Sequence, residues 1–449
     1  MLDFLIFYEV KNREFESIVL LGDELRKRGY SVDYFSFFEY DNVEKRKKFF
    51  NKVKIAVVPS LYNDYELLSA IYAVTGKVKN IVNLRWEQVF QIWRDQKFDS
   101  YVYPKEHAKL AYHFCWGAHA FNRLRESGIS EKNLFVTGPL QMDVLRPEFR
   151  EYYQTKDELF DKYQISKTKQ CILFISSFAS SSMSKEVLEN SIIEFPEDEK
   201  EHSRKWHSME KKTRDTILDW LKKLSVEKDC TIIYRPHPSE TNTVEVSNLE
   251  KYNNIRVIRD ENVKQWILTC DQVYTWFSTS IAEAYFAGTQ CAVLRPVIMD
   301  PIEEYSIYQD IDFITSYEKF SKYYDNFDSK SDSSMLNKIT MKQNYDFDKI
   351  LPSYIRCADG LEKTYKDDYQ FPWSKFSGIK LLWNRFYYIK EDLKCSVARY
   401  VIKNGKLKKS KLYKKSKNII NLIAQGKKDV ISQNEFEILR KKFNGILEK

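Results

Sequence analysis

The sequence has 449 residues, of which 43% are hydrophobic, and its formal net charge is +8. A chain of this length can bury more than one sizeable core, so we expect a globular protein of two or three domains. Aromatic residues make up 15% of the chain. They are spread along it and form no stacking motif of the kind that single-strand binders use, so nucleic acid is not an expected partner.

The first residues, MLDFLIFYEVKNREFES, contain an apolar run shorter than the core of a signal peptide, so export is not expected. No apolar stretch approaches the roughly 20 residues that span a bilayer as a helix. The seven cysteines lie far apart and include no CxxC pair, which indicates neither a disulfide framework nor a zinc cluster. We therefore expect a cytoplasmic protein whose cysteines pack in its cores.

Short apolar runs alternate with helix-length segments from the start of the chain, which is the rhythm of a parallel sheet. The runs LDFLIFY, YSVDYFSF, KIAVVPS, KNIVNL, HFCWG and NLFVTG predict a first α/β domain over residues 1–150. The runs CILFISS, CTIIYRP, IRVI, QVYTW and CAVLR predict a second one over residues 165–345. We further expect a returning helical segment over 346–372 and a basic helical tail over 373–449.

The second domain begins with an irregular segment from Ser176 to Glu199, rich in serine and acidic residues. Because it shows no periodicity, we expect a mobile loop there. A helix is predicted after it, over TRDTILDWLKKLSVEKD.

The segment YRPHPS directly follows the strand-like run CTIIY. It places Arg235 and His237 at the carboxyl end of a parallel strand, where ligands bind in open α/β sheets. The two prolines hold the loop, so both side chains are presented with little ordering entropy to a phosphate or nucleotide. The alternative is a rigid turn whose imidazole caps a helix.

A second motif, DQVYTWFSTSIAEAYFAG, runs from a strand into a helix. Ser278, Thr279 and Ser280 are expected at the helix N-terminus, where backbone N–H groups and hydroxyls attract an anion such as a diphosphate. Glu283 falls on the first turns of the helix and suits the hydroxyls of a ribose. An ordinary helix cap, with Glu283 compensating the helix dipole, is the alternative.

YRPHPSE followed by FSTSIAEAYFAG resembles the donor site of GT-B enzymes that make bacterial surface carbohydrate, including bacterial sialyltransferases and CDP-glycerol polymerases. CWGAHAFNRLRESGISEKNLFVTGPLQMDVL is similar to the segment before the interdomain linker in these enzymes and in non-hydrolysing UDP-GlcNAc epimerases. The resemblance covers about residues 1–300. It implies two Rossmann-like domains facing a cleft, with donor phosphates on His237 and on Ser278–Ser280.

Two charged clusters follow strands of the first domain and are expected to bind the acceptor. One is Glu9, Arg13 and Glu14, and the other is Arg85 with Trp86, Glu87 and Gln88. Glu87 is the favoured general base, since Trp86 beside it would desolvate the carboxylate and raise its pKa. Trp86 is also expected to stack on a sugar ring. The alternative is an ion pair at the strand end.

No metal ion or other cofactor is expected beside the nucleotide-sugar substrate. His107, His113 and His119 recur every six residues, a spacing that neither a helix nor a strand brings to one face. The first strand is followed by charged residues where a dinucleotide fold has glycines, which argues against NAD.

The function expected from these features is transfer of a sugar from a nucleotide-activated donor to a glycan, in bacterial surface polysaccharide synthesis. The acceptor is expected to be lipid-linked. A polyol-phosphate transferase, a UDP-sugar epimerase and a non-catalytic scaffold are the alternatives. The tail is expected to dock on the anionic inner face of the plasma membrane through its lysines, namely Lys406, Lys408, Lys409, Lys411, Lys414 and Lys415.

Overall fold

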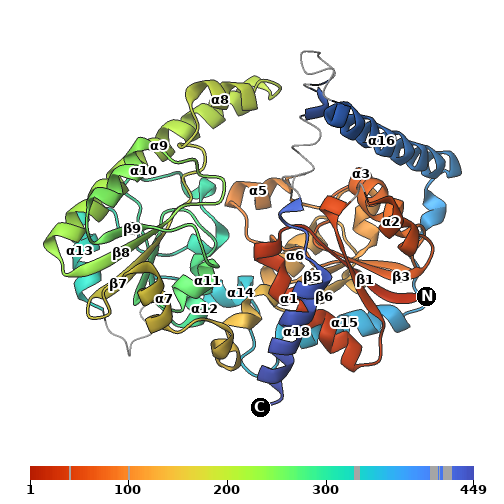
Figure 1. Ribbon diagram of the computed structural model, residues 1–449, viewed down its shortest axis with the longest axis horizontal. Coiled ribbons are helices and arrows are strands. Elements are labelled where there is room, and N and C mark those ends of the chain that lie inside the picture. The colour runs from red at the N-terminus through yellow and green to blue at the C-terminus, as the bar shows by residue number, and fades with distance from the viewer. Residues whose placement is uncertain (40–41, 100–101, 328–333, 405–412, 414, 418–426) are drawn as a thin grey trace. The chain divides into compact units, whose positions relative to one another are not determined.

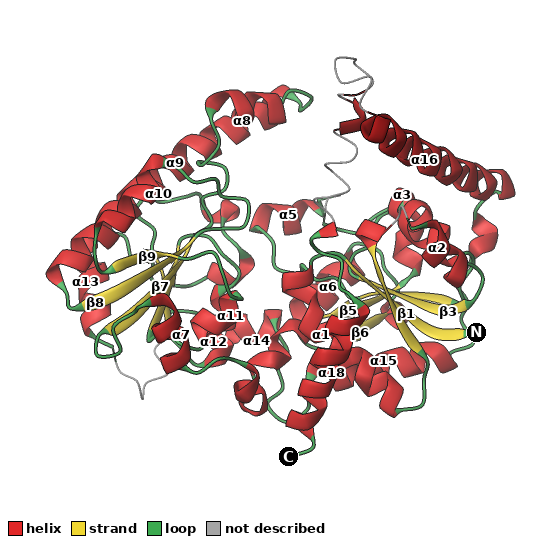
Figure 2. Cartoon of the chain, viewed as in Figure 1, coloured by secondary structure: helices red, strands yellow, loops and turns green. Residues whose placement is uncertain are grey.

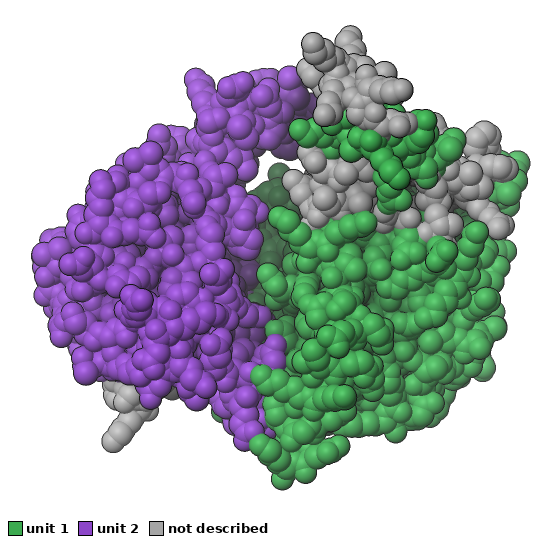
Figure 3. Space-filling view, viewed as in Figure 1, with its two compact units in different colours: residues 1–144, 342–449 green, residues 145–341 purple. Residues whose placement is uncertain are grey.

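The computed structural model describes residues 1–39, 42–99, 102–327, 334–404, 413, 415–417 and 427–449 (Figure 1). The chain divides into two compact units (Figure 3). Unit 1 comprises Met1–Val144 and Lys342–Lys449, and unit 2 is the continuous stretch Leu145–Met341. Each unit contains one parallel sheet with helices packed on it (Figure 2), which confirms the predicted pair of α/β domains.

The sheet of unit 1 has six strands in the order β2-β1-β3-β4-β5-β6. All neighbouring strands are parallel, and their residues are almost entirely apolar because both faces of the sheet are covered. The strands are β1 (Leu2–Tyr8), β2 (Val32–Ser36), β3 (Val53–Val58), β4 (Asn80–Asn83), β5 (Tyr112–Cys115) and β6 (Leu134–Val136).

The helices of unit 1 come from both ends of the chain. They are α1 (Lys11–Lys27), α2 (Val43–Phe49), α3 (Asp64–Glu66), α4 (Ala73–Thr75), α5 (Ile92–Lys97), α6 (Ala118–Glu126), α15 (Ser353–Lys366), α16 (Gly378–Asn404) and α18 (Gln433–Leu447), and α14 (Lys338–Asn344) spans the unit boundary.

Side chains of β1 alternate between two cores. Leu5 and Phe7 enter a core that also holds Trp373 and Leu381 from the end of the chain. Phe4 points the other way, where its ring contacts Tyr30 and Tyr365 at centroid distances of 5.3 and 5.7 Å. The C-terminal residues therefore help to cover both faces of the first sheet.

The sheet of unit 2 has five parallel strands in the order β11-β10-β7-β8-β9. The strands are β7 (Gln170–Ile175), β8 (Cys230–Arg235), β9 (Ile255–Val257), β10 (Gln272–Thr275) and β11 (Gln290–Val293). The helices are α7 (Lys156–Tyr163), α8 (Lys185–Ser191), α9 (Glu197–Glu227), α10 (Val244–Ser247), α11 (Val263–Ile267), α12 (Ile281–Ala287) and α13 (Tyr317–Asp325).

The segment predicted as a mobile loop is partly helical. Helix α8 forms within it because Ser184 accepts a hydrogen bond from the backbone N–H of Val187 and so caps the first turn. Helix α9 begins at Glu197, well before the predicted start, and runs for 31 residues. Three acidic residues in its first turn favour the start at this point.

The predicted helical tail contains α16 and α18. Lys406, Lys408, Lys409, Lys411 and Lys414 lie outside the described residues, whereas Lys415 is described and exposed. Within the described parts of the chain, no helix combines the length and the apolar character needed to cross a membrane. The cysteines at positions 115, 171, 230, 270, 291 and 357 are buried, as predicted for core thiols.

Candidate functional sites

The two charged clusters predicted in the first domain meet at one edge of its sheet. Strands β1, β3 and β4 are neighbours, so the segments after their carboxyl ends lie side by side. Arg13 Nη1 donates to Glu87 Oε1 at 2.6 Å, which joins the β1 loop to the β4 loop. Arg13 Nη2 lies 2.7 Å from Glu14 Oε1 and 3.7 Å from Glu9 Oε2.

Glu14 holds the turn between β1 and α1. Its side chain is fully buried and accepts hydrogen bonds from the backbone N–H groups of Glu9, at 2.9 Å, and of Val10, at 3.3 Å. Both ends of the carboxylate are therefore occupied by this turn and by Arg13. Glu14 positions the loop, and its predicted contact with an acceptor would require these bonds to break.

Arg85 and Trp86 are core residues, with exposures of 1% and 4%. Arg85 adopts a left-handed backbone with φ of 50°, and its Nη2 donates to the carbonyl of Val102. Its Nε and Nη1 have no hydrogen-bond partner among the described residues. Because the faces of Trp86 are covered by protein, the indole does not offer the predicted stacking surface for a sugar in this conformation.

Glu87 and Glu9 are the accessible carboxylates of this cluster. The Glu87 side chain is 63% exposed, so the predicted desolvation by Trp86 is absent, and Arg13 holds the carboxylate instead. The Glu9 side chain is 41% exposed. Burial by neighbouring protein raises the pKa of Glu9, against the opposing effect of the Arg13 charge.

Tyr62 and Glu66 complete this edge and were missed by the sequence analysis. Both follow β3, and Glu66 Oε2 accepts from the backbone N–H of Tyr62 at 2.7 Å. Burial raises the pKa of Tyr62 to about 12, and the charges of Arg85 and Glu87 act on the same phenol. The signal was available, because KIAVVPSLYND is a strand followed by polar residues.

In unit 2, His237 stands on an exposed loop after the carboxyl end of β8. The backbone N–H of Ser239 donates to His237 Nδ1 at 3.1 Å, so the neutral ring carries its proton on Nε2. Partial burial lowers the pKa of His237, although the Glu240 carboxylate opposes this effect. The loop thus presents a neutral imidazole whose remaining N–H can donate to an anion.

Glu240, the last residue of YRPHPSE, holds this loop by hydrogen bonds. The sequence analysis did not predict this role. Glu240 is 3% exposed, and its carboxylate accepts from the backbone N–H of His237 at 3.1 Å and from Tyr234 OH at 2.8 Å. It also accepts from Ser176 Oγ, which ties the loop to the end of β7.

Arg235 and Glu283, the other predicted donor contacts, are engaged within the protein. Arg235 donates from Nη1 to the Asp260 carbonyl at 2.7 Å and from Nη2 to the Glu261 carbonyl at 2.6 Å. Burial lowers the pKa of Arg235, and the charge of Glu283 is close enough to act on it. Glu283 is 9% exposed and lies 3.2 Å from Lys264 Nζ, a buried ion pair that occupies the predicted ribose contact.

Ser278, Thr279 and Ser280 precede α12 as predicted, and Ser280 is its N-cap residue. The Ser280 side chain makes no capping hydrogen bond, so its hydroxyl is not used by the helix. Tyr308 OH both receives the N–H of Ser278 and donates to its carbonyl, at 3.1 and 2.9 Å. Thr279 is exposed.

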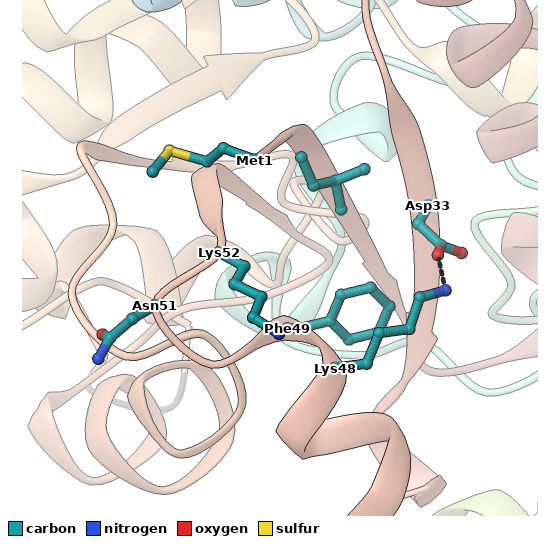
Figure 4. A pocket seen from close by; sticks show the side chains of 7 residues that line it. Met1, Asp33, Lys48, Phe49, Asn51 and Lys52 are labelled. Carbon is teal, nitrogen blue, oxygen red and sulfur yellow. Dashed lines mark hydrogen bonds and ion pairs between the residues drawn. The ribbon is translucent and has the colours of Figure 1, made fainter.

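A pocket of about 380 Å³ lies at the opposite edge of the first sheet (Figure 4). It is lined by Met1, Leu2, Asp33, Lys48, Phe49, Asn51 and Lys52, and the Lys48 Nζ to Asp33 Oδ2 distance across it is 2.6 Å. It contains none of the predicted site residues. Since ligands of open α/β sheets bind at the carboxyl ends of strands, we assign this pocket no role.

No family model matches the sequence, and no curated protein matches it. The fold is similar to that of solved structures. One is UDP-GlcNAc 2-epimerase from Methanocaldococcus jannaschii in complex with UDP-GlcNAc and UDP (TM-score 0.52, 13% identity, 80% of this chain and 99% of that one). Another is MnaA from S. aureus with UDP (TM-score 0.50, 15% identity, 81% and 97%).

A variant of the wall teichoic acid polymerase TagF is also similar (TM-score 0.54, 13% identity, 81% of this chain and 89% of that one). At these identities the likeness concerns the fold alone. Together with the two parallel sheets it shows that the chain has the GT-B fold, with two α/β domains.

Proposed function

We propose that this chain is a glycosyltransferase of bacterial surface polysaccharide synthesis. It moves a sugar from a nucleotide-activated donor to a lipid-linked glycan. Unit 2 binds the donor and unit 1 the acceptor. The observation that carries the proposal is the His237 loop. Glu240 and Ser239 fix its backbone and its imidazole, so a single N–H donor stands ready at a strand end.

A neutral imidazole suits a diphosphate because its Nε2–H can donate a hydrogen bond to a phosphate oxygen. Arg259 adds positive charge beside it, since its Nη1 donates to the His237 carbonyl at 3.4 Å. The hydroxyls of Ser278–Ser280 add further donors at the end of β10, on the same edge of the sheet.

A second candidate is an epimerase of a nucleotide sugar, and the similarity in fold to two structures solved with UDP favours it. A polyol-phosphate transferase is favoured in the same way by the similarity to TagF. All three functions require nucleotide binding in unit 2. All three also require catalytic turnover, whereas a non-catalytic scaffold would show none.

The first experiment is a thermal-shift screen with CMP, CDP, UDP and GDP. We expect one nucleotide to raise the melting temperature of the wild type and to have no effect on His237→Ala. The matched control is His202→Ala, a half-exposed histidine on α9 in the same unit, which should keep the response. A folded His237→Ala protein with unchanged affinity would remove the support for the donor site.

Product analysis then separates the candidates. A glycosyltransferase releases the nucleotide only when an acceptor glycan is present. An epimerase converts a nucleotide sugar without any acceptor and releases no nucleotide as product of turnover. A CDP-activated polyol as the sole productive donor would identify the polyol-phosphate transferase, and absence of all three reactions despite nucleotide binding would support the scaffold.

A further inference from the structure

In helix α16, whose course is drawn in Figure 1, several of the described side chains are apolar and exposed and fall in one row. The row consists of Ile379, Leu382, Leu393, Val397 and Tyr400, with exposures of 71, 54, 64, 43 and 68%. At about 100° per residue, these five positions fall within an arc of about 60° on the helix surface, over a length of about 32 Å. We call this row the apolar stripe. Exposed apolar side chains that gather on one face of a helix are a candidate interaction site.

Some described residues of α16 outside the row are buried or bound within the protein. Leu381 belongs to the core of unit 1, and Lys380 Nζ lies 3.2 Å from Asp64 Oδ2. Near the other end, Ala398 and Val401 are buried, with exposures of 1 and 4%. Leu381 packs α16 against the core of unit 1, whereas the side chains of the apolar stripe are exposed.

The charge of the chain is segregated toward this region. Residues 373–449 hold 20 of the 72 lysine and arginine residues but only 6 of the 64 aspartate and glutamate residues, a formal net charge of +14. Residues 1–372 hold 52 and 58, a net charge of −6. On α16 itself, Lys394 and Lys403 are exposed and flank the apolar stripe, one about 60° beyond each of its edges.

We propose that the apolar stripe of α16 is a docking surface for an anionic lipid bilayer, on which the helix lies flat. An apolar row between lysines is the arrangement that buries apolar side chains at the level of the headgroups and keeps ammonium groups beside lipid phosphates. Cations in residues 373–449 add attraction to a negatively charged leaflet, which salt screens.

A second copy of this chain fits the apolar stripe less well. Pairing two copies through α16 would bring two segments of net charge +14 together, and like charges at an interface oppose association. A nucleic acid would supply negative charge for the lysines but no apolar environment for the five exposed side chains. An anionic lipid bilayer supplies both.

The test is flotation of the full chain with vesicles of phosphatidylcholine, with and without phosphatidylglycerol. We expect binding to the anionic vesicles only, falling as salt is added. Leu393→Glu/Val397→Glu should lower the bound fraction about 10-fold or more, since it places charge in the apolar stripe. The matched control is Val226→Glu/Val244→Glu in unit 2, two apolar residues with exposures of 74 and 73%, which should float like the wild type.

Equal flotation of the wild type and the Leu393→Glu/Val397→Glu variant would overturn the proposal, as would failure of the wild type to float. A wild type that sediments as a dimer, does not float and becomes monomeric in the same variant would show that the stripe binds a second copy. Flotation is measured without nucleotide, so it does not depend on the proposed function. A thermal shift with nucleotide on the same samples tests the proposed function separately.

Discussion

Arg13 connects two loops that lie far apart in the sequence, and this contact shapes what Glu87 can do. A carboxylate held at 2.6 Å by a guanidinium is fixed in position, as a general base must be. If Glu87 is the base, Glu87→Gln should lower turnover about 100-fold or more while donor affinity persists, because the amide keeps the size of the side chain.

The control for this variant is Glu126→Gln, a half-exposed glutamate on α6 that should leave turnover unchanged. Steady-state kinetics and nucleotide titration measure both quantities. Near-normal transfer by Glu87→Gln would exclude this residue as the base.

Glu9 is the competing base at the same strand edge, and its pH profile would identify it. Burial raises the pKa of Glu9, and a base must be ionised to act. If Glu9 is the base, kcat/KM should rise with pH through a pKa above that of an ordinary glutamate, and this acid limb should be lost together with turnover in Glu9→Gln. An unchanged profile in a fully active Glu9→Gln protein would count against it.

At the scale of elements, α9 holds the serine-rich segment after β7 through Glu210. This carboxyl is 2% exposed and accepts from the backbone N–H of Ser181 at 2.8 Å and from Trp206 Nε1 at 2.9 Å. Burial raises the pKa of Glu210 from 4.5 to about 7. The hydrogen bond from Ser181 ties the segment predicted as a mobile loop to α9.

The free energy of unfolding should therefore depend on the ionisation of Glu210. Below pH 4.5 the carboxyl is protonated in both the folded and the unfolded chain and has no effect. Between pH 4.5 and 7 only the unfolded chain is ionised, so stability falls as pH rises, by about 3 kcal/mol in total above pH 7. In Glu210→Gln this loss should disappear, and urea titrations at pH 5 and 7.5 measure the difference. An identical pH dependence in both proteins would contradict it.

The aromatic side chain of Phe436 packs helix α18 against the rest of unit 1. Phe436 is 4% exposed and stacks on Tyr34 at a centroid distance of 4.2 Å, with Phe15 edge-on at 5.3 Å. Phe436→Ala should destabilise this contact by about 3 kcal/mol. Amide hydrogen exchange in α18 should then accelerate about 100-fold. Ile438→Ala, exposed on the same helix, should change it little, and equal acceleration in both variants would argue against this role of Phe436.

The elements that were predictable from the sequence are those whose pattern is local. The apolar runs LDFLIFY and CTIIY became β1 and β8 because strands buried on both faces need continuous apolar residues. The loop after β8 was predictable from its prolines, but the partners of Arg235 were not. Its guanidinium binds carbonyls of Asp260 and Glu261, and only the folded sheet brings β9 beside β8.

At the scale of the whole molecule, unit 1 combines both ends of the chain, and the contacts that join them are not visible in any local sequence pattern. The buried carboxylate of Asp143 accepts from the backbone N–H groups of Ser353 and Tyr354, at 3.0 and 2.6 Å, across more than two hundred residues. Such a contact ties α15 to the first domain. An amphipathic helix shows that one face will be buried, but not which distant surface will cover it.

Unit 2, in contrast, is one continuous stretch, which leads to a prediction about the division of labour. Every residue that the sequence predicts to contact the donor lies within Leu145–Met341, namely Arg235, His237, Ser278, Thr279, Ser280 and Glu283. The residues that hold them, such as Glu240, Lys264 and Tyr308, lie in the same stretch.

A fragment spanning residues 145–341 should therefore fold and bind the nucleotide with a dissociation constant within about threefold of that of the full chain, while catalysing no transfer. Circular dichroism and calorimetric titration test folding and affinity, and the same fragment with His237→Ala is the control that should not bind. A folded fragment without affinity would show that unit 1 supplies donor contacts, and the assignment of donor binding to unit 2 alone would fail. If each domain binds one of the two substrates, the fragment should keep its affinity for the nucleotide but have no turnover. It retains the imidazole at the edge of the second sheet, but it lacks the carboxylates at the edge of the first.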